Sequence, residues 1–168
     1  SNMLANMAAQ SIEITEAENP VEILANELTT DRSGAGRYRG GAPFFRDYRV
    51  TEDRAVVQVR ADRQQIPPYG LSGGHSGQPG ECVFDPYGEP RKLASKVTME
   101  CERGDVVRWI LPGGGGWGNP LEREPEQVLR DVRNEIVSPE RAEIDYGVVI
   151  NTDNWSVDVT ATQSLRAA

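Results

Sequence analysis

A run of four glycines, residues 113–116, followed by Trp117 limits what this chain can fold into more than any other feature of its sequence. Glycine loses more conformational freedom on folding than any other residue, so a folded protein keeps such a run where backbone angles or close approaches exclude a Cβ atom. The apolar residues 106–111 before the run are typical of a strand, and the sequence from Pro125 onward is typical of a helix. The glycine loop is therefore predicted to join a β-rich part of the chain to a helical part.

The composition of the 168-residue chain favours a loop-rich β fold over a helical bundle, because 17 glycines and 11 prolines accompany a hydrophobic content of only 38%. The length is enough for one domain with a hydrophobic core. We predict an α+β fold, mainly antiparallel β (sandwich or barrel-like), with a small C-terminal helical part. Residues 11–168 are predicted to form this single domain, and residues 1–10 to be a tag remnant or disordered N-terminus.

Charge and hydropathy narrow the classes of partner. The net charge of −8 argues against nucleic acid, whose phosphates require a basic surface. No apolar run approaches the length of a membrane-spanning helix and no signal peptide is evident, so the sequence predicts a cytoplasmic protein with no membrane contact. Cys82 and Cys101 are then predicted to be free thiols, with a disulfide between them as the less favoured alternative.

Several short segments have the alternation or apolar content of strands. Residues 11–14 are interpreted as an edge strand, and residues 21–28 as a longer strand rather than a helix. Residues 44–50 and 55–61 are predicted to be two strands of a hairpin, with residues 51–54 as its turn. Further strands are predicted at residues 81–84, 96–101 and 106–111.

Helical signals gather near the C-terminus. Pro125 suits a first helical position, and the apolar residues that follow it recur with helical spacing. Ser138 before a proline is typical of an N-cap, and Gly147 of a helix end. Thr160 is predicted to cap a last short helix. Between these helices, residues 148–150 and 156–159 are predicted to form a hairpin.

The glycine run fits the pattern G-x-G-x-x-G at Gly113, Gly115 and Gly118, which raises the question of a dinucleotide site. Such a site needs a helix that opens directly after the glycines, so that its N-terminus meets the pyrophosphate. Here Asn119-Pro120 intervenes and no βαβ unit surrounds the loop, so we favour a structural turn.

His75 is the sole histidine, and a zinc site needs several histidine or cysteine ligands. As a general base it would need an orienting partner, and we favour a plain loop histidine. Arg37, Tyr38 and Arg39 are considered as an interface patch, although a solvated loop face is the more frequent explanation.

Charged residues also stand at the exit of the predicted strand 55–61. Charges at a strand end can bind anionic groups of a substrate, here through Arg60 and Arg63, or the charges of Arg60, Asp62 and Arg63 can pair with one another as plain structure. No residue is assigned a catalytic or metal-ligating role. The candidates for a cleft or an interface are Arg60, Asp62, Arg63, His75, Gly113, Gly114, Gly115, Gly116 and Trp117.

Five collinear motifs resemble one known family. Residues 31–41 resemble the D-S-G-G-A-G-(R/K)-(F/Y)-R-G-G signature of the hydantoinase B/5-oxoprolinase family. Residues 67–80 are similar to its P-P-W-G-x-x-G-G-x-x-G-x-P-G loop, and residues 112–120 to its P-G-G-G-G-(Y/F)-G-(D/N)-P segment. Ser95-Lys96 matches its P-S-K motif without the proline, and residues 146–149 match its closing Y-G-V.

The resemblance implies a function that the residues alone do not. The family includes N-methylhydantoinase of the hydantoinase B type, 5-oxoprolinase and acetone- and acetophenone-type carboxylases, so ATP-dependent opening of a cyclic amide, or carboxylation, is implied for a complex. A hydantoinase A-like partner would bind ATP, and the upstream hydantoinase B segment would hold a divalent metal.

This chain resembles the C-terminal third of a B-type subunit, so we expect it to be inactive alone and to hold no cofactor itself. Two alternatives remain open. In the first alternative the chain is a free-standing, non-catalytic interaction module. In the second it is part of a related ATP-dependent carboxylase. A homo-oligomer is a further option.

Overall fold

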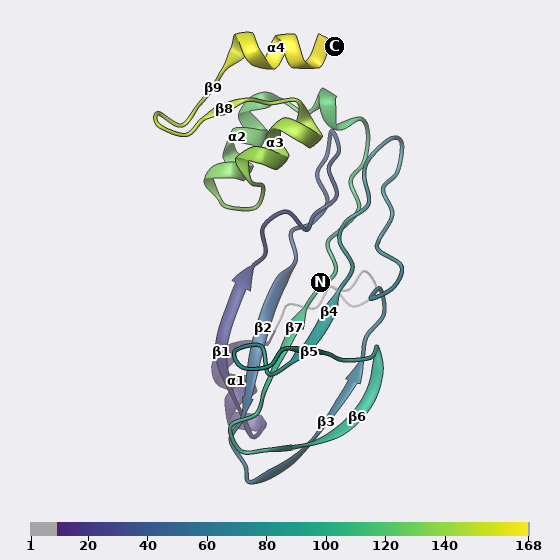
Figure 1. Ribbon diagram of the computed structural model, residues 1–168, viewed down its shortest axis with the longest axis vertical. Coiled ribbons are helices and arrows are strands. Elements are labelled where there is room, and N and C mark those ends of the chain that lie inside the picture. The colour runs from purple at the N-terminus through teal and green to yellow at the C-terminus, as the bar shows by residue number, and fades with distance from the viewer. Residues whose placement is uncertain (1–9, 168) are drawn as a thin grey trace. The chain divides into compact units, whose positions relative to one another are not determined.

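The computed structural model describes residues 10–167, and the contacts within the chain divide it into two compact units (Figure 1). The strand unit comprises the residues up to 26, residues 46–60 and residues 82–109. The loop–helix unit comprises residues 27–45, 61–81 and 110–168. The prediction of one domain over residues 11–168 stays a prediction, and the predicted tag lies, except for Gln10, outside the described residues.

The strand unit centres on a five-stranded sheet. Its order is β1 (Val21–Leu28), β2 (Phe44–Val50), β7 (Val106–Ile110), β4 (Glu81–Phe84) and β5 (Arg91–Lys92). Neighbouring strands run in opposite directions, as in the pairing that places Val83 opposite Lys92. The predicted α+β fold with mainly antiparallel strands is confirmed, although the sheets do not close into a barrel.

A second, two-stranded sheet pairs β3 (Arg54–Arg60) with β6 (Lys96–Glu102) in antiparallel register. Val57 lies opposite Met99, and the alternating burial along both strands matches the predicted alternation. The predicted hairpin between residues 44–50 and 55–61 is wrong. Both edges of β2 are already hydrogen-bonded, to β1 and to β7, so β3 leaves that sheet and pairs with β6 instead.

The predicted edge strand at residues 11–14 is also wrong, because α1 (Ile12–Glu18) occupies this segment. Ser11 acts as the N-cap, and its hydroxyl oxygen accepts a hydrogen bond from the Ile14 amide at 3.4 Å. Asn19 ends the helix, since both its main-chain and side-chain N–H groups donate to the Thr15 carbonyl. Local capping therefore overrides the weak alternation of this segment.

The loop–helix unit carries the predicted C-terminal helices. Pro125 is the first residue of α2 (Pro125–Arg133), and Ser138 caps α3 (Pro139–Tyr146), accepting from the Arg141 amide at 3.2 Å. Gly147 ends α3 in the left-handed conformation with a φ of 60°. These three predictions are confirmed. The remaining elements are the 3₁₀ helix η1 (Pro120–Glu122), the short strands β8 (Ile150–Asn151) and β9 (Ser156–Val157), and α4 (Val159–Ala167).

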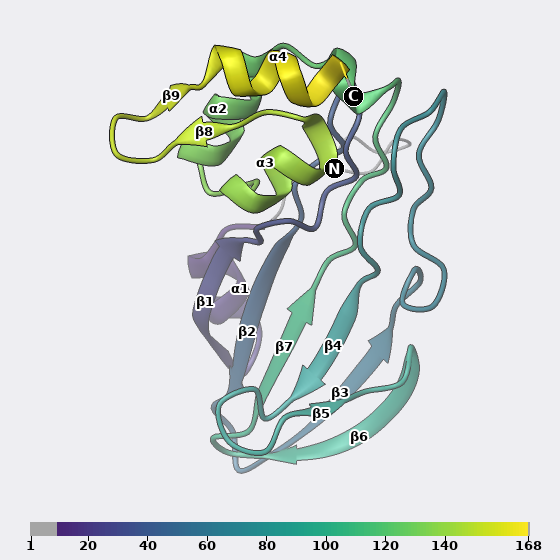
Figure 2. The ribbon, with the colours of Figure 1, turned by 45° about the horizontal axis from the view of Figure 1, so that its top comes forward.

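The predicted C-terminal hairpin forms between β8 and β9, where Ile150 lies opposite Val157. The predicted cap of the last helix is wrong, because α4 begins at Val159, before Thr160. Asp158 takes the capping role instead, since its side chain accepts a hydrogen bond from the Ala161 amide at 2.9 Å. Figure 2 shows α2, α3 and α4 gathered with this hairpin.

The helices enclose a small hydrophobic core. The fully buried side chains include Val128 on α2, Ala142 and Tyr146 on α3, and Val148 after it. Ala35 reaches this core from a loop far upstream in the sequence. No helix among residues 10–167 combines the length and the apolar character that crossing a bilayer requires.

Both cysteines are free and buried in the strand unit, as predicted for two thiols. Burial raises the pKa of Cys82 from 9.0 to about 11, and burial together with the nearby Asp105 carboxylate raises the pKa of Cys101. A raised pKa means that the thiolate is disfavoured in the folded chain. The stabilisation contributed by the Cys82 thiol is therefore fully present below pH 9 and is lost as the pH rises toward 11.

We expect alkylation to report this burial directly. Iodoacetamide at neutral pH should leave both thiols unmodified in the folded chain and modify both in concentrated urea, as read by mass spectrometry. Modification of the folded chain at the rate of the unfolded chain would contradict the buried positions.

Candidate functional site

Three glycine-rich segments lie side by side in the loop–helix unit and form what we call the glycine layer, residues 32–41, 68–80 and 113–118. Main-chain hydrogen bonds join each segment to the other two. The Gly34 amide donates to the Gly114 carbonyl at 2.8 Å, the His75 amide to the Ala35 carbonyl at 2.7 Å, and the Gly116 amide to the His75 carbonyl at 2.9 Å. The layer is thus held together mainly by its backbone, and the Arg32 side chain adds a hydrogen bond to the Pro79 carbonyl.

The segments approach so closely that most of their glycines have no room for a side chain. A Cβ atom on Gly113 would lie 1.7 Å from the Arg32 carbonyl oxygen, and one on Gly115 would lie 1.9 Å from that of Tyr69. Gly41 is different, because a Cβ atom there would meet nothing within 4 Å. The expectation that the glycine run serves close approaches is confirmed.

Three of the four amide groups in the glycine run have acceptors inside the protein, namely those of Gly113, Gly114 and Gly116. Gly113 donates to the Gln78 carbonyl at 2.9 Å, and Gly118 donates to the Leu71 carbonyl at 3.0 Å. A phosphate cradle needs free amides that converge on a helix N-terminus. The next helix, η1, begins with Pro120, which has no N–H to offer. The geometry is that of the structural turn favoured from the sequence.

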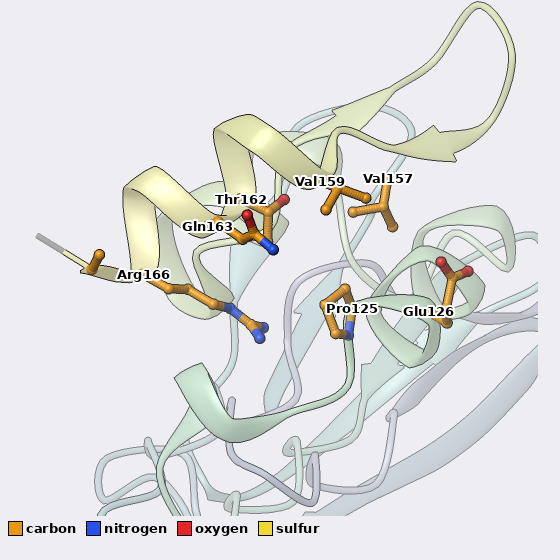
Figure 3. A pocket seen from close by; sticks show the side chains of 8 residues that line it. Pro125, Glu126, Val157, Val159, Thr162, Gln163 and Arg166 are labelled. Atoms are coloured by element: carbon orange, nitrogen blue, oxygen red, sulfur yellow. The ribbon is translucent and has the colours of Figure 1, made fainter.

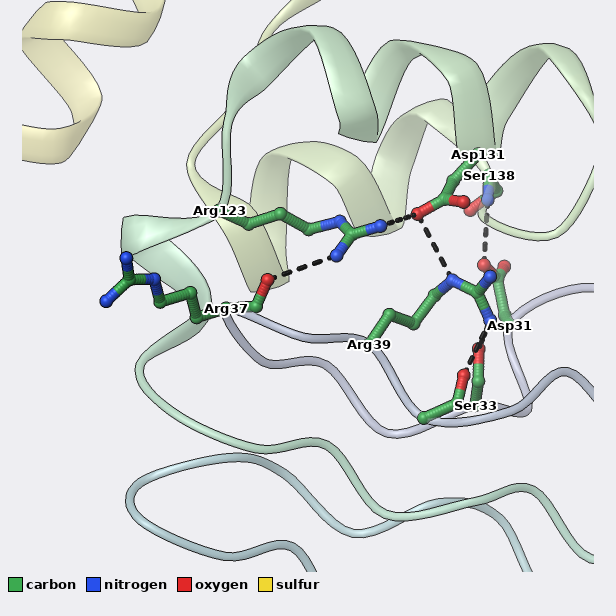
Figure 4. A network of polar contacts seen from close by, with 8 residues as sticks. Asp31, Ser33, Arg37, Arg39, Arg123, Asp131 and Ser138 are labelled. Atoms are coloured by element: carbon green, nitrogen blue, oxygen red, sulfur yellow. Dashed lines mark hydrogen bonds and ion pairs between the residues drawn. The ribbon is translucent and has the colours of Figure 1, made fainter.

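A buried ionic cluster, consisting of Arg39, Arg123 and Asp131, ties the glycine layer to the helices. Both arginines point at the same carboxylate oxygen of Asp131, with Arg39 Nε at 3.1 Å and Arg123 Nη2 at 2.9 Å (Figure 4). Arg39 also donates to the Gly40 carbonyl at 2.6 Å, and Arg123 to the Arg37 carbonyl at 3.1 Å. All three side chains are at most 16% exposed.

Sequence reasoning missed this cluster and placed Arg39 on a solvated loop face. One signal was present, because Asp131 lies three residues after Val128 and next to Val132, on the apolar face of α2. A carboxylate on the buried face of a helix requires a partner of opposite charge. The identity of that partner depends on long-range folding and could not be found from spacing.

The main chain of His75 is hydrogen-bonded to Ala35 and Gly116, while its ring is about half exposed. Ring atom Nδ1 lies 3.8 Å from Asp145 Oδ1, beyond hydrogen-bond distance. Asp145 is itself paired with Arg141 at 3.0 Å, one turn earlier on α3. His75 therefore has an acidic neighbour but no close orienting partner of the kind that a general base needs.

Arg60 and Arg63 are exposed, and Asp62 is exposed beside them. Arg63 has a φ of 61°, and its carbonyl oxygen accepts a hydrogen bond from the Gly80 amide at 2.9 Å. Within residues 10–167 the structure gives none of these three side chains an ion pair. Their role in a cleft stays a prediction. Across residues 10–167, no group of three or more His, Cys, Asp and Glu side chains is placed to hold a metal ion.

A hollow of about 430 Å³ lies beside α4, and its surface is mostly apolar although half of the side chains that line it are polar or charged (Figure 3). Arg166 points into it, but its guanidinium donates to the carbonyls of Tyr146 at 3.1 Å and Arg123 at 2.8 Å. Burial lowers the pKa of Arg166. Because this arginine anchors α4 to the preceding elements, we assign it a structural role. The lining residues include Pro125, Val157, Val159, Thr162 and Gln163.

An exposed apolar row crosses one edge of the glycine layer and consists of Tyr38, Leu71 and Trp117, one residue from each segment. Trp117 forms a β-bridge with Tyr38 on one side and with Leu71 on the other. The Tyr38 and Trp117 ring centroids are 5.6 Å apart. Trp117, a residue singled out from the sequence, is thus placed between two further exposed apolar residues.

A family model described as hydantoinase B/oxoprolinase matches residues 1–120, which include all three segments of the glycine layer. The chain belongs to the hydantoinase B/oxoprolinase family. This confirms the resemblance that the five motifs indicated.

Three relatives of this hydantoinase B-type chain align with nearly all of it. An uncharacterised protein of Methanocaldococcus jannaschii, MJ0963, is 40% identical over 92% of the chain. The B component of a putative D-/L-hydantoinase from a Pseudomonas species is 34% identical over 98%, and the β component of the caprolactamase of Pseudomonas jessenii is 34% identical over 94%. The chain spans only 28% of the length of each relative.

Two solved structures share the fold of this hydantoinase B-type chain, each with a TM-score of 0.77 over 94% of it. One is the ATP-dependent caprolactamase from Pseudomonas jessenii, which is 30% identical and of whose chain 28% is covered. The other is a nucleotide-free acetone carboxylase, 23% identical with 26% of its chain covered, so this likeness shows the fold alone.

Proposed function

We propose that this chain acts as the C-terminal segment of a hydantoinase B-type subunit in an ATP-dependent complex that hydrolyses cyclic amides such as hydantoins or 5-oxoproline. In this proposal the chain is inactive alone. Support comes from the family match, from relatives named as components of a hydantoinase and a caprolactamase, and from the small share of each relative that the chain spans.

One observation carries the proposal, namely that the glycine layer turns its main-chain polar groups inward. Amides of the glycine run donate to carbonyls of the neighbouring segments, and the closest approaches leave no space for side chains. Such a layer provides a rigid support and offers few reactive groups of its own. A supporting segment that shapes a cleft or a subunit contact fits this chemistry better than a self-sufficient enzyme.

The proposal assigns ATP and the divalent metal to other parts of the complex. Within residues 10–167 no group of three or more His, Cys, Asp and Glu side chains is placed to hold a metal ion, and the amides of Gly113, Gly114 and Gly116 are engaged with carbonyls. We therefore place the nucleotide on a hydantoinase A-like subunit and the metal in the upstream hydantoinase B segment.

The second candidate function is a role in a related ATP-dependent carboxylase. We retain it because an acetone carboxylase shares the fold of this chain. We favour hydrolysis because the more similar solved structure, at 30% identity, is a caprolactamase. A stand-alone interaction module is the third candidate.

A chimera provides the test. In the caprolactamase β component of Pseudomonas jessenii, the segment that aligns with this chain is replaced by the chain, and ATP-dependent caprolactam hydrolysis is measured with the partner subunit present. We expect the chimera to hydrolyse caprolactam, while the β component without the segment, and the isolated chain, do not. Turnover of a cyclic amide by the isolated chain would contradict the proposal, as would an inactive chimera that folds and assembles.

The same chimera tests the charged residues at the exit of β3. If Arg60 and Arg63 bind anionic substrate groups, joint replacement of Arg60, Asp62 and Arg63 by alanine should raise the KM for ATP, the anionic substrate, without loss of stability. Unchanged kinetics would exclude a cleft role for them.

A further inference from the structure

We propose that the exposed apolar row of Tyr38, Leu71 and Trp117 is the surface on which the remaining part of a B-type subunit docks. This inference rests on the proposed function, and it assigns to that function a specific contact. The partner is a polypeptide that buries an apolar patch with a polar rim.

The three side chains share one face and are open to solvent. Residues paired in a β-bridge direct their side chains to the same side, and Trp117 is paired with both of the others. Tyr38 is 60% exposed, Leu71 58% and Trp117 48%. Large apolar side chains that are contiguous and exposed mark interaction surfaces, whereas scattered ones need no explanation.

The row is held in place before any partner arrives. Tyr38 and Trp117 exchange two main-chain hydrogen bonds of 2.9 Å, and Leu71 donates to the Gly116 carbonyl at 2.9 Å. A backbone that is already ordered loses little further entropy on binding, which leaves more of the contact energy for affinity. Tryptophan and tyrosine are also the residues most enriched among those that dominate interface energetics.

Charged groups rim the row, as at the borders of known interfaces. The Arg37 guanidinium lies 5.8 Å from the centre of the Tyr38 ring and 3.7 Å from the Glu122 carboxylate. Both charged side chains are more than half exposed, so they can stay hydrated at the edge while the three apolar side chains are covered.

The partner that covers the apolar row is inferred from the length of this chain compared with the lengths of its relatives. In each relative the matching segment is only 28% of a longer chain, so the rest of a B-type subunit is covalently tethered next to it. Tethering gives a high effective concentration, so a small apolar row is sufficient for stable docking. A separate A-like subunit or a second copy of this chain would not have that advantage.

Binding of two recombinant pieces tests the contact. The probe is the caprolactamase β component of Pseudomonas jessenii with its matching segment removed, and its Kd for the full chain is measured by calorimetry. Joint replacement of Leu71→Ser and Trp117→Ser should weaken binding by about 30-fold or more. The control Ile144→Ser, at a 71% exposed apolar residue on α3, should change the Kd by less than about twofold.

A second measurement does not require the truncated β component to fold. Because Cys82 and Cys101 are buried, a cysteine introduced as Leu71→Cys is the site that a maleimide should label in the isolated chain, and in the chimera the label is read at this same residue by mass spectrometry. We expect fast labelling in the isolated chain and labelling slower by about tenfold or more in the chimera described above, where the row is covered.

The two proposals fail in different ways. Equal labelling rates in an active chimera would overturn the docking surface and leave the proposed function standing. An inactive chimera would count against the proposed function itself. The chain could instead dimerise through the apolar row, or bind an A-like subunit through it in the absence of the truncated β component. Either result, if abolished by Leu71→Ser and Trp117→Ser, would overturn the assignment of the rest of the B-type subunit as the partner.

Discussion

Replacing Gly113 with alanine is expected to lower the free energy of unfolding by at least about 4 kcal/mol, which would leave the loop–helix unit largely unfolded. The added Cβ atom would lie 1.7 Å from the carbonyl oxygen of Arg32, where real contacts are not closer than about 3 Å. That oxygen is main chain and also accepts a hydrogen bond from the Gln78 amide, so it cannot rotate away as a side chain would.

The chain offers a matched control in Gly41, in the adjoining segment. A Cβ atom there meets nothing within 4 Å, and the Gly41 carbonyl can still accept from the Gly114 amide. Gly41→Ala should therefore change stability by less than about 1 kcal/mol. Urea unfolding followed by circular dichroism measures both variants. Similar midpoints for the two would mean that the layer is looser than its contacts indicate.

The second large effect is expected at Asp131. Asp131→Asn keeps the shape of the side chain but removes the charge that Arg39 and Arg123 share, so two guanidinium groups remain buried without a carboxylate. Removing one partner of a buried ionic cluster costs about 3–5 kcal/mol. Thermal and urea unfolding should both report this loss.

Glu126→Gln removes an acidic charge from the same helix, outside its buried face, and is expected to change stability by less than about 0.5 kcal/mol. Adding Arg39→Met to Asp131→Asn should recover part of the loss, since one buried charge is then removed with the carboxylate. A loss below about 1 kcal/mol for Asp131→Asn would show that water reaches the cluster and hydrates it.

The parts of the fold that local chemistry decides could be predicted from the sequence. Pro125 at a helix start, Ser138 as a cap and Gly147 as a left-handed stop depend on neighbours within a turn. The same reasoning failed at Ser11, where a capping side chain was present but the alternation of the following residues was given more weight. The prediction that β2 and β3 form a hairpin also failed. Adjacency in sequence does not show that both edges of β2 are already paired with other strands.

The candidate site was predictable only in part, for the same physical reason. The glycine run indicated close approaches, yet the groups that approach it, such as the carbonyls of Arg32 and Tyr69, come from segments distant in sequence. Trp117 was a candidate, whereas Leu71 carried no signal until the structure paired the two residues in a β-bridge. Arg39 was expected on a solvated face and lies in a buried ionic cluster instead.

The backbone pairing of the glycine layer also has a consequence for how the chain is made. Residues 32–41 and 68–80 take many of their main-chain partners from residues 113–118, so the layer cannot close during synthesis until residue 118 has left the ribosome. Until then the nascent segments carry unpaired amides and carbonyls, and their contacts over long sequence separations form slowly. A pause in translation before that residue would lengthen the time in which the growing chain can aggregate or bind a chaperone.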